Sequence, residues 1–159
     1  MSALFLSLCI IIPSSLHVSK KQERVICKYE STIRKAATRN SIEPELLSAV
    51  IYVESTFRPS VVSHANACGL TQVIPKWTGG QETGYRKYSC RELKNPEVSI
   101  RVGARILGYL ISHYASGNED KGLCMYSTGS VCLKDKDLYK RSRYVKKVRK
   151  VYDAIINHR

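Results

Sequence analysis

The chain has 159 residues, of which 43% are hydrophobic and 25% charged, as in an ordinary globular domain that buries its own core. Lysine and arginine number 26 against 13 aspartates and glutamates, so the formal net charge is +13. The length, with no internal repeat and no low-complexity tract, argues against a second domain. The charge predicts attraction to a polyanion but does not choose among nucleic acid, acidic lipid and an anionic cell wall.

The chain begins with an apolar run from Ala3 to Ile12 that is broken by Pro13. The run is too short to span a bilayer, but it fits the central region of a signal peptide. Because no basic residue precedes it and no clean small-residue cleavage site follows it, an apolar segment packed on the domain is the alternative. We therefore expect residues 1–20 to form a signal peptide or an apolar N-terminal segment, and residues 21–159 to form the folded domain.

Beyond this segment, apolar residues recur at steps of three and four positions, and the alternation typical of strands is nearly absent. The pattern predicts an all-α fold, with long helices at 25–39, 43–57, 97–114 and 144–157. Pro44 suits the first position of the second helix, and Pro59 ends it. Segment 58–95 contains turn-forming glycines and is expected to be irregular, while a short helix is expected at 123–126, after a polar loop at 116–120.

Six cysteines in so short a chain are typical of an oxidising compartment. A bridge between Cys124 and Cys132 is plausible because Gly129 lies in the short segment between them, and Cys68 with Cys90 is a second candidate pair. The pairing stays open, since cysteines also serve as small buried hydrophobic residues. No Cys-x-x-Cys motif and no histidine cluster has the spacing of a zinc site, so we expect neither a metal nor another cofactor.

The positive charge is concentrated at the C-terminus, where residues 133–159 carry ten basic and three acidic side chains, a net charge of +7. The apolar face of the last predicted helix comprises Tyr144, Val148, Val151, Tyr152, Ile155 and Ile156, and its basic face Lys146, Lys147, Arg149 and Lys150. Nucleic-acid modules interleave exposed aromatic and basic residues. Because the aromatic residues here lie on the apolar face, we expect no nucleic-acid partner, and the basic face is a candidate surface for an anionic envelope.

Glu54 is the leading candidate for a catalytic residue. It falls in the last turn of the second predicted helix, among Val50, Val53 and Phe57. Burial among apolar neighbours and the negative end of the helix dipole both disfavour the carboxylate and therefore raise its pKa. A carboxyl group that stays protonated near neutral pH can act as a general acid. On these grounds alone, an ordinary solvated glutamate at a helix end is the more common case.

The residues around Glu54 form a longer pattern. Ser55 follows directly, Ser63 lies nine residues after the glutamate, and Gln72 lies eighteen residues after it in a Gly-Leu-Thr-Gln stretch. Further matches follow in order at 95–110, 125–129 and 143–148. The pattern resembles the soluble lytic transglycosylase (SLT) family, whose fold is goose-type lysozyme-like, and the resemblance covers residues 25–156.

Three positions depart from the pattern of that family. Thr71 stands where the family usually has methionine, and we expect this change to reshape one wall of the sugar groove. Ser127 replaces a usual asparagine, so a hydrogen bond made there should be shortened or lost. Lys140 occupies a place that is often acidic.

The resemblance implies an enzyme that cleaves the β-1,4 bond between N-acetylmuramic acid and N-acetylglucosamine in peptidoglycan, leaving a 1,6-anhydro end. Glu54 would donate a proton to the glycosidic oxygen and then, as a carboxylate, take one from the sugar 6-hydroxyl. The residues implied to bind or orient the substrate are Ser63, Gln72, Tyr126, Ser127 and Tyr144. A hydrolase usually needs two carboxylates, and no aspartate or glutamate stands between Glu54 and Gly80.

Two other functions remain open. A hydrolytic lysozyme (muramidase) would use water in place of the 6-hydroxyl, and a non-catalytic cationic module would only bind the cell wall or another polyanion. Trp77, the single tryptophan, is either a sugar-stacking platform or a loop anchor. For the enzyme, the expected context is a monomer acting on glycan strands, exported to the periplasm or cell envelope, or belonging to a phage virion, a phage lysis system or a secretion system.

Overall fold

The structure, a computed structural model, describes residues 16–157. Within this range the chain is helical, and its β-type pairing is limited to isolated bridges that join Val62 to Cys68 and Cys68 to Val73. The α-helices are α1 (Lys20–Arg39), α2 (Pro44–Ser55), α3 (Cys90–Leu93), α4 (Pro96–Tyr109), α5 (Glu119–Thr128), α6 (Val131–Lys134), α7 (Leu138–Arg141) and α8 (Arg143–Ile156). Two short 3₁₀ helices, η1 (Pro75–Trp77) and η2 (Gln81–Thr83), lie in the irregular segment, and the π-helical η3 (Leu110–Tyr114) continues α4. The predicted all-α fold is confirmed.

Helix α1 begins earlier than the apolar pattern predicts. Ser19 caps it through a capping box, in which the Ser19 hydroxyl accepts from the Gln22 N–H and the Gln22 side chain accepts from the Ser19 N–H. The helix therefore starts at Lys20, inside the segment 1–20 that was expected to precede the domain. Residues 1–15 of that segment lie outside the described part of the chain. Between residues 16 and 157, no helix is long and apolar enough to cross a membrane.

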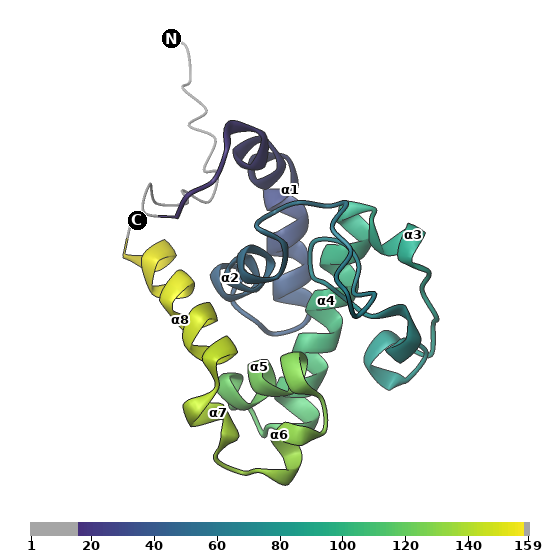
Figure 1. Ribbon diagram of the computed structural model, residues 1–159, viewed down its shortest axis with the longest axis vertical. Helices are drawn as coiled ribbons and strands as arrows, with labels where there is room; N and C mark the ends of the chain where they lie inside the picture. The colour runs from purple at the N-terminus through teal and green to yellow at the C-terminus, as the bar shows by residue number, and fades with distance from the viewer. Residues whose placement is uncertain (1–15, 158–159) are drawn as a thin grey trace.

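The core forms where two helix pairs pack together. Helix α8 lies along α2 on the left of Figure 1, and α1 packs against α4 in the centre. Helix α2 is central to this arrangement, because Leu46, Leu47 and Ile51 are fully buried. The residues buried from the other helices include Ile33, Leu107 and Val148. These packed pairs place the end of α2, with Glu54, beside the start of α8.

Segment 58–95 is irregular, as predicted, but it is tied down at both ends. A disulfide joins Cys68 to Cys90, which confirms one of the two candidate pairs. The Thr71 hydroxyl donates to the Ser99 carbonyl at 2.9 Å, and the Thr71 N–H donates to the Ser99 hydroxyl at 3.1 Å. The disulfide fixes the loop that follows α2 to α3, and the two hydrogen bonds fix it to α4.

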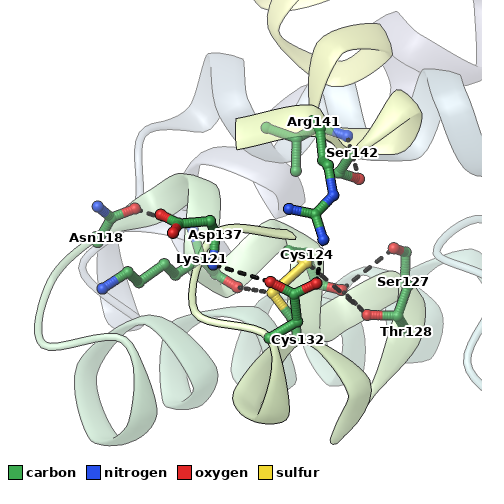
Figure 2. The surroundings of a disulfide bond; sticks show 11 residues. Asn118, Lys121, Cys124, Ser127, Thr128, Cys132, Asp137, Arg141 and Ser142 are labelled. Atoms are coloured by element: carbon green, nitrogen blue, oxygen red, sulfur yellow. Dashed lines mark hydrogen bonds and ion pairs between the residues drawn. A yellow bond between two sulfur atoms is a disulfide. The ribbon is translucent and has the colours of Figure 1, made fainter. Parts of the chain in front are cut away.

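The second candidate disulfide, between Cys124 and Cys132, is also present and joins α5 to α6. Figure 2 shows that the Ser127 and Thr128 hydroxyls both donate to the Cys124 carbonyl, one turn back on α5. Cys27 is disulfide-bonded as well. The bridge and the capping contacts hold the end of α5 in a defined place.

The C-terminal part differs from the prediction in its short elements. Helix α5 starts at Glu119, before the predicted start, because the Asn118 side chain accepts from the Lys121 N–H at 2.9 Å. Helices α6 and α7 were not predicted, since each has only four residues and carries little periodicity.

Two residues of α8 were assigned to the wrong face. Arg149 does not belong to a free basic surface, because its guanidinium bridges Glu119 at 2.8 Å and Asp120 at 2.7 Å and so ties α8 to α5. Ile156 is 37% exposed, whereas its neighbour Ile155 is buried. The apolar stripe of α8 therefore includes the buried Val145, which the sequence pattern omitted, and Ile156 lies at its edge.

Candidate active site

Glu54 lies in the last turn of α2, and its side chain is mostly buried. Burial raises the pKa of its carboxyl group from 4.5 to about 7, and a hydrogen bond from Tyr144 opposes this rise without cancelling it. Near neutral pH the group is therefore present in both the protonated and the ionised form. One side chain can then donate a proton and later accept one.

Tyr144 is the residue in direct contact with Glu54. Its hydroxyl donates to Glu54 Oε1 at 2.6 Å. Burial and the nearby Glu54 carboxyl group hold the pKa of Tyr144 well above its usual range, so the phenol remains a donor at neutral pH. The contact exists because α8 packs along α2, and it favours the ionised form of Glu54.

Tyr126, on α5, contacts the same region through a different partner. Its hydroxyl donates to the backbone carbonyl of Thr71 at 2.7 Å. Burial and the charge of Glu54 raise the pKa of Tyr126 above its usual value, so this tyrosine also stays protonated. Tyr126 thus holds the loop that carries Gln72, while the direct hydrogen bond to Glu54 comes from Tyr144.

The loop directs the side chains of Thr71 and Gln72 to different hydrogen-bond partners. Thr71 is fully buried and points at α4, so the expectation that it reshapes a wall of the sugar groove is wrong. The physical reason is its hydroxyl, which is satisfied by Ser99 inside the protein. Gln72 has a φ of 50°, and its amide nitrogen donates to the carbonyls of Val61 at 3.1 Å and Gly69 at 2.9 Å.

Next to Tyr126 lies a cavity of about 610 Å³. Its lining comprises Gln72, Val73, Ile74, Trp77, Glu82, Ile106, Leu110, Met125, Tyr126, Ser127, Thr128, Gly129 and Ser130. Trp77 is 69% exposed at this cavity, which argues against a buried loop anchor, and Lys76 Nζ lies over its ring at 5.3 Å from the centroid. We name this space the glycan-side cavity, after the sugar groove that the sequence resemblance leads us to expect.

The two remaining predicted site residues, Ser63 and Ser127, make no hydrogen bond to Glu54. Ser63 is half-buried, and its hydroxyl accepts from the Ala67 N–H at 3.1 Å, so it braces the turn before Gly69 and does not line the glycan-side cavity. Ser127 does line the cavity, and its hydroxyl donates to the Cys124 carbonyl at 3.2 Å. Of the predicted set, the structure therefore joins Tyr144 to Glu54 directly and brings Gln72, Tyr126 and Ser127 to one cavity.

Several residues of the cavity were not predicted from the sequence. Ile106 and Leu110 lie four residues apart on α4 and η3, a spacing that indicates a core position as readily as a groove. Glu82, in the irregular segment, was from the sequence only a reserve candidate for the acid, to be considered if Glu54 proved dispensable. Among residues 16–157, no group of three or more histidine, cysteine, aspartate or glutamate side chains could hold a metal ion.

The order of these motifs matches a known family. Residues 31–148 match the family model described as the transglycosylase SLT domain, which covers more than half of the chain. The chain belongs to the SLT domain family. Two curated relatives of this SLT domain are the membrane-bound lytic murein transglycosylase C of Actinobacillus pleuropneumoniae serotype 5b, 39% identical over 95 residues, and the endo-type membrane-bound lytic murein transglycosylase A of Klebsiella pneumoniae, 36% identical over 97 residues.

These alignments cover 57% and 58% of this chain but only 26% and 48% of the two relatives. Among solved structures, the 70 kDa soluble lytic transglycosylase SLT70 of Escherichia coli superposes with a TM-score of 0.71 at 20% identity, covering 86% of this chain and 25% of that one. A lytic transglycosylase Slt of Pseudomonas aeruginosa gives a TM-score of 0.64 at the same identity and coverage. The structural matches confirm the expected lysozyme-like fold.

Proposed function

We propose that this SLT domain is a lytic transglycosylase, which cleaves the bond between N-acetylmuramic acid and N-acetylglucosamine in peptidoglycan and leaves a 1,6-anhydro end. The observation that carries the proposal is Glu54, a mostly buried carboxyl group with a pKa of about 7 that accepts a hydrogen bond from Tyr144. The names of the curated relatives support the same reaction and substrate.

In the proposed reaction, protonated Glu54 donates its proton to the oxygen of the leaving sugar. The bond between the anomeric carbon and that oxygen breaks, and the carboxylate of Glu54 remains beside the positive centre. Glu54 then takes the proton of the 6-hydroxyl group of the N-acetylmuramic acid. At the same time the oxygen of this hydroxyl group forms a bond to the anomeric carbon of the same sugar. The hydrogen bond from Tyr144 strengthens as Glu54 becomes charged, so it assists the proton donation.

The alternative function is a hydrolytic lysozyme, and the position of Glu82 is the observation that favours it. Hydrolysis with inversion uses a second carboxylate to activate water, and Glu82 supplies a carboxylate to the glycan-side cavity. The products decide between the two reactions. Purified peptidoglycan digested with the protein should yield ends that mass spectrometry identifies as 1,6-anhydro-muramoyl and that borohydride does not reduce. Reducing ends that disappear in a Glu82→Gln variant would establish hydrolysis instead.

Replacing Tyr144 with phenylalanine tests how Glu54 is tuned. The hydroxyl favours the carboxylate, so its loss should raise the pKa of Glu54 above about 7 and move the alkaline limb of the pH–rate profile upward, by at least about one pH unit. The rate at the optimum should fall about 10- to 100-fold, the value of a hydrogen bond to a charged group.

Tyr152→Phe is the matched control for this variant. Tyr152 lies on the same helix, but its hydroxyl donates to Glu43, away from Glu54. This change should alter stability and leave the pH–rate profile in place. If the alkaline limb of Tyr144→Phe coincides with that of the unchanged protein, Tyr144 does not set the pKa of Glu54.

Export to the cell envelope and attachment to its anionic surface are part of the same proposal. The presence of disulfides in the chain supports an oxidising compartment. The part of segment 1–20 that precedes α1 is proposed to direct export, and the rest of the chain to form one catalytic domain that acts as a monomer. We also propose a phage or secretion-system setting, which fits the same chemistry.

Attachment through α8 should depend on salt. Lys146, Lys147 and Lys150 are exposed, whereas Arg149 is committed to α5. Reversing the three lysines to glutamate should weaken binding to insoluble peptidoglycan and spare the turnover of short soluble fragments. For the unchanged protein, binding should weaken as ionic strength rises, because exposed charges are screened over about 10 Å at 0.1 M salt. Cosedimentation at low and high salt measures this, and an affinity that does not change would show that the face is only solvated.

A further inference from the structure

A second and larger cavity, of about 800 Å³, lies between α1, α4 and η2. It shares no lining residue with the glycan-side cavity. Four cationic side chains line it, in two rows with a four-residue spacing: Lys35 and Arg39 on α1, and Arg101 and Arg105 on α4. We name this space the cationic cavity.

Most of these cations have no counterion in the part of the chain that the structure describes. No carboxylate of the described residues lies within 4.0 Å of Lys35, Arg39 or Arg105. Arg101 has only a long ion pair of 3.8 Å with Glu97. Several arginines elsewhere are closely paired, as Arg34 is with Glu30 at 2.8 Å and Arg149 with Asp120 at 2.7 Å. A concave surface with uncompensated positive charge concentrates anions.

The rest of the lining adds one carboxylate, Glu97, at the side of Arg101, and otherwise uncharged hydrogen-bonding groups. Tyr109 stacks on His113 with ring centroids 4.0 Å apart, and its hydroxyl donates to the Gln81 side chain at 2.6 Å. Asn40 and Ser112 also line the cavity. Cβ atoms four residues apart on a helix are separated by about 5–6 Å. The two rows of cations therefore match a ligand with several separated carboxylates better than they match a single compact anion.

The two cavities meet at one turn. In η2, Glu82 lines the glycan-side cavity, while Gln81 and Thr83 line the cationic one. Helix α4 is likewise shared, with Ile106 on the glycan side and Arg105 on the cationic side. A branched ligand in the glycan-side cavity can thus reach the cationic cavity across η2.

We infer that the cationic cavity binds the carboxylates of the peptide branches that peptidoglycan carries on N-acetylmuramic acid. This inference rests on the proposed function, because it assigns the backbone of that substrate to one cavity and its acidic branches to the other. The cavity thereby distinguishes peptide-bearing glycan from glycan without peptides.

The test compares two variants with the same change in net charge. Lys35→Gln/Arg39→Gln/Arg105→Gln removes three charges from the cavity. Lys94→Gln/Lys134→Gln/Lys136→Gln removes three exposed charges that line neither cavity. A fluorescent muramyl stem peptide is titrated into each protein and its affinity read from anisotropy. The cavity variant should bind at least about tenfold more weakly than the unchanged protein, since each exposed charge contact contributes a factor of up to about five, and the control should bind equally well.

A second measurement uses cleavage. Glycan strands with their peptides, and the same strands after removal of the peptides by an amidase, are given to all three proteins. The cavity variant should show a raised KM on the peptide-bearing strands and unchanged kinetics on the bare ones. Equal peptide binding by the two variants, or an equal loss on both substrates, overturns the inference. A short DNA duplex that displaces the labelled peptide at a lower concentration of negative charges than unlabelled peptide needs would instead identify a phosphate backbone as the ligand. An unchanged protein that binds the peptide and cleaves neither substrate contradicts the proposed function alone.

Discussion

Replacing Glu54 with glutamine is expected to lower the rate of glycan cleavage by at least about 100-fold, because general acid–base catalysis typically contributes about 10²- to 10⁴-fold. Glutamine keeps the size of the side chain and can still accept from Tyr144, but it cannot give up or take a proton. Binding of intact glycan should persist, since the cavity lining is unchanged. Release of soluble muropeptides measures the rate, and a variant that keeps more than about a tenth of the activity would exclude Glu54 as the acid.

The same variant should be more stable than the unchanged protein, in a way that depends on pH. Below pH 4.5 Glu54 is protonated in both the folded and the unfolded state, so the two proteins should have similar free energies of unfolding. As pH rises from 4.5 to about 7, the unfolded chain ionises while the folded one retains its proton, and the unchanged protein loses stability. Above about pH 7 the advantage of Glu54→Gln should reach up to about 3 kcal/mol, at about 1.4 kcal/mol per pH unit.

Urea unfolding at pH 4 and pH 8 measures this difference. Effects of other titrating groups are common to both proteins and cancel in the comparison. A stability difference that is the same at both pH values would show that the folded protein does not raise the pKa of Glu54.

Replacing Gly69 with alanine is expected to cost about 2 to 5 kcal/mol of folding stability. Gly69 has a φ of +81°, which L side chains rarely adopt, and a Cβ there would lie 1.9 Å from the backbone oxygen of Leu93 and 2.8 Å from the hydroxyl of Ser99. The loop cannot move away easily, because Cys68 is bridged to Cys90. Since Gly69 also holds the Gln72 amide, activity should fall with stability.

Gly117→Ala separates the two causes of this cost. Gly117 has a φ of +83°, close to that of Gly69, but a Cβ there would meet nothing within 4 Å. It should therefore lose only the conformational part, about 1 kcal/mol. The free energy of unfolding from urea titration measures both. Equal losses in the two variants would mean that the contact with Leu93 adds nothing.

The positions of the long helices follow from the sequence alone, because apolar spacing over 12 or more residues is a local property of the chain. Helix ends were less predictable. Helix α1 starts at Lys20 because of a cap made by two polar side chains, and α6 has only four residues. Both disulfide pairs between described cysteines were candidates from spacing, but spacing left the pairing open.

For the candidate site too, some features follow from the sequence and others only from the tertiary structure. The sequence by itself determined which carboxyl group to suspect, since Glu54 ends an apolar helix and carries the offsets to Ser63 and Gln72. Only the tertiary structure decided that Tyr144 donates to Glu54 while Tyr126 donates to the Thr71 carbonyl, because both contacts join helices far apart in the chain. It likewise decided that Thr71 faces α4, that Arg149 is paired and that Arg105 is not, since burial and counterions depend on which helices pack together.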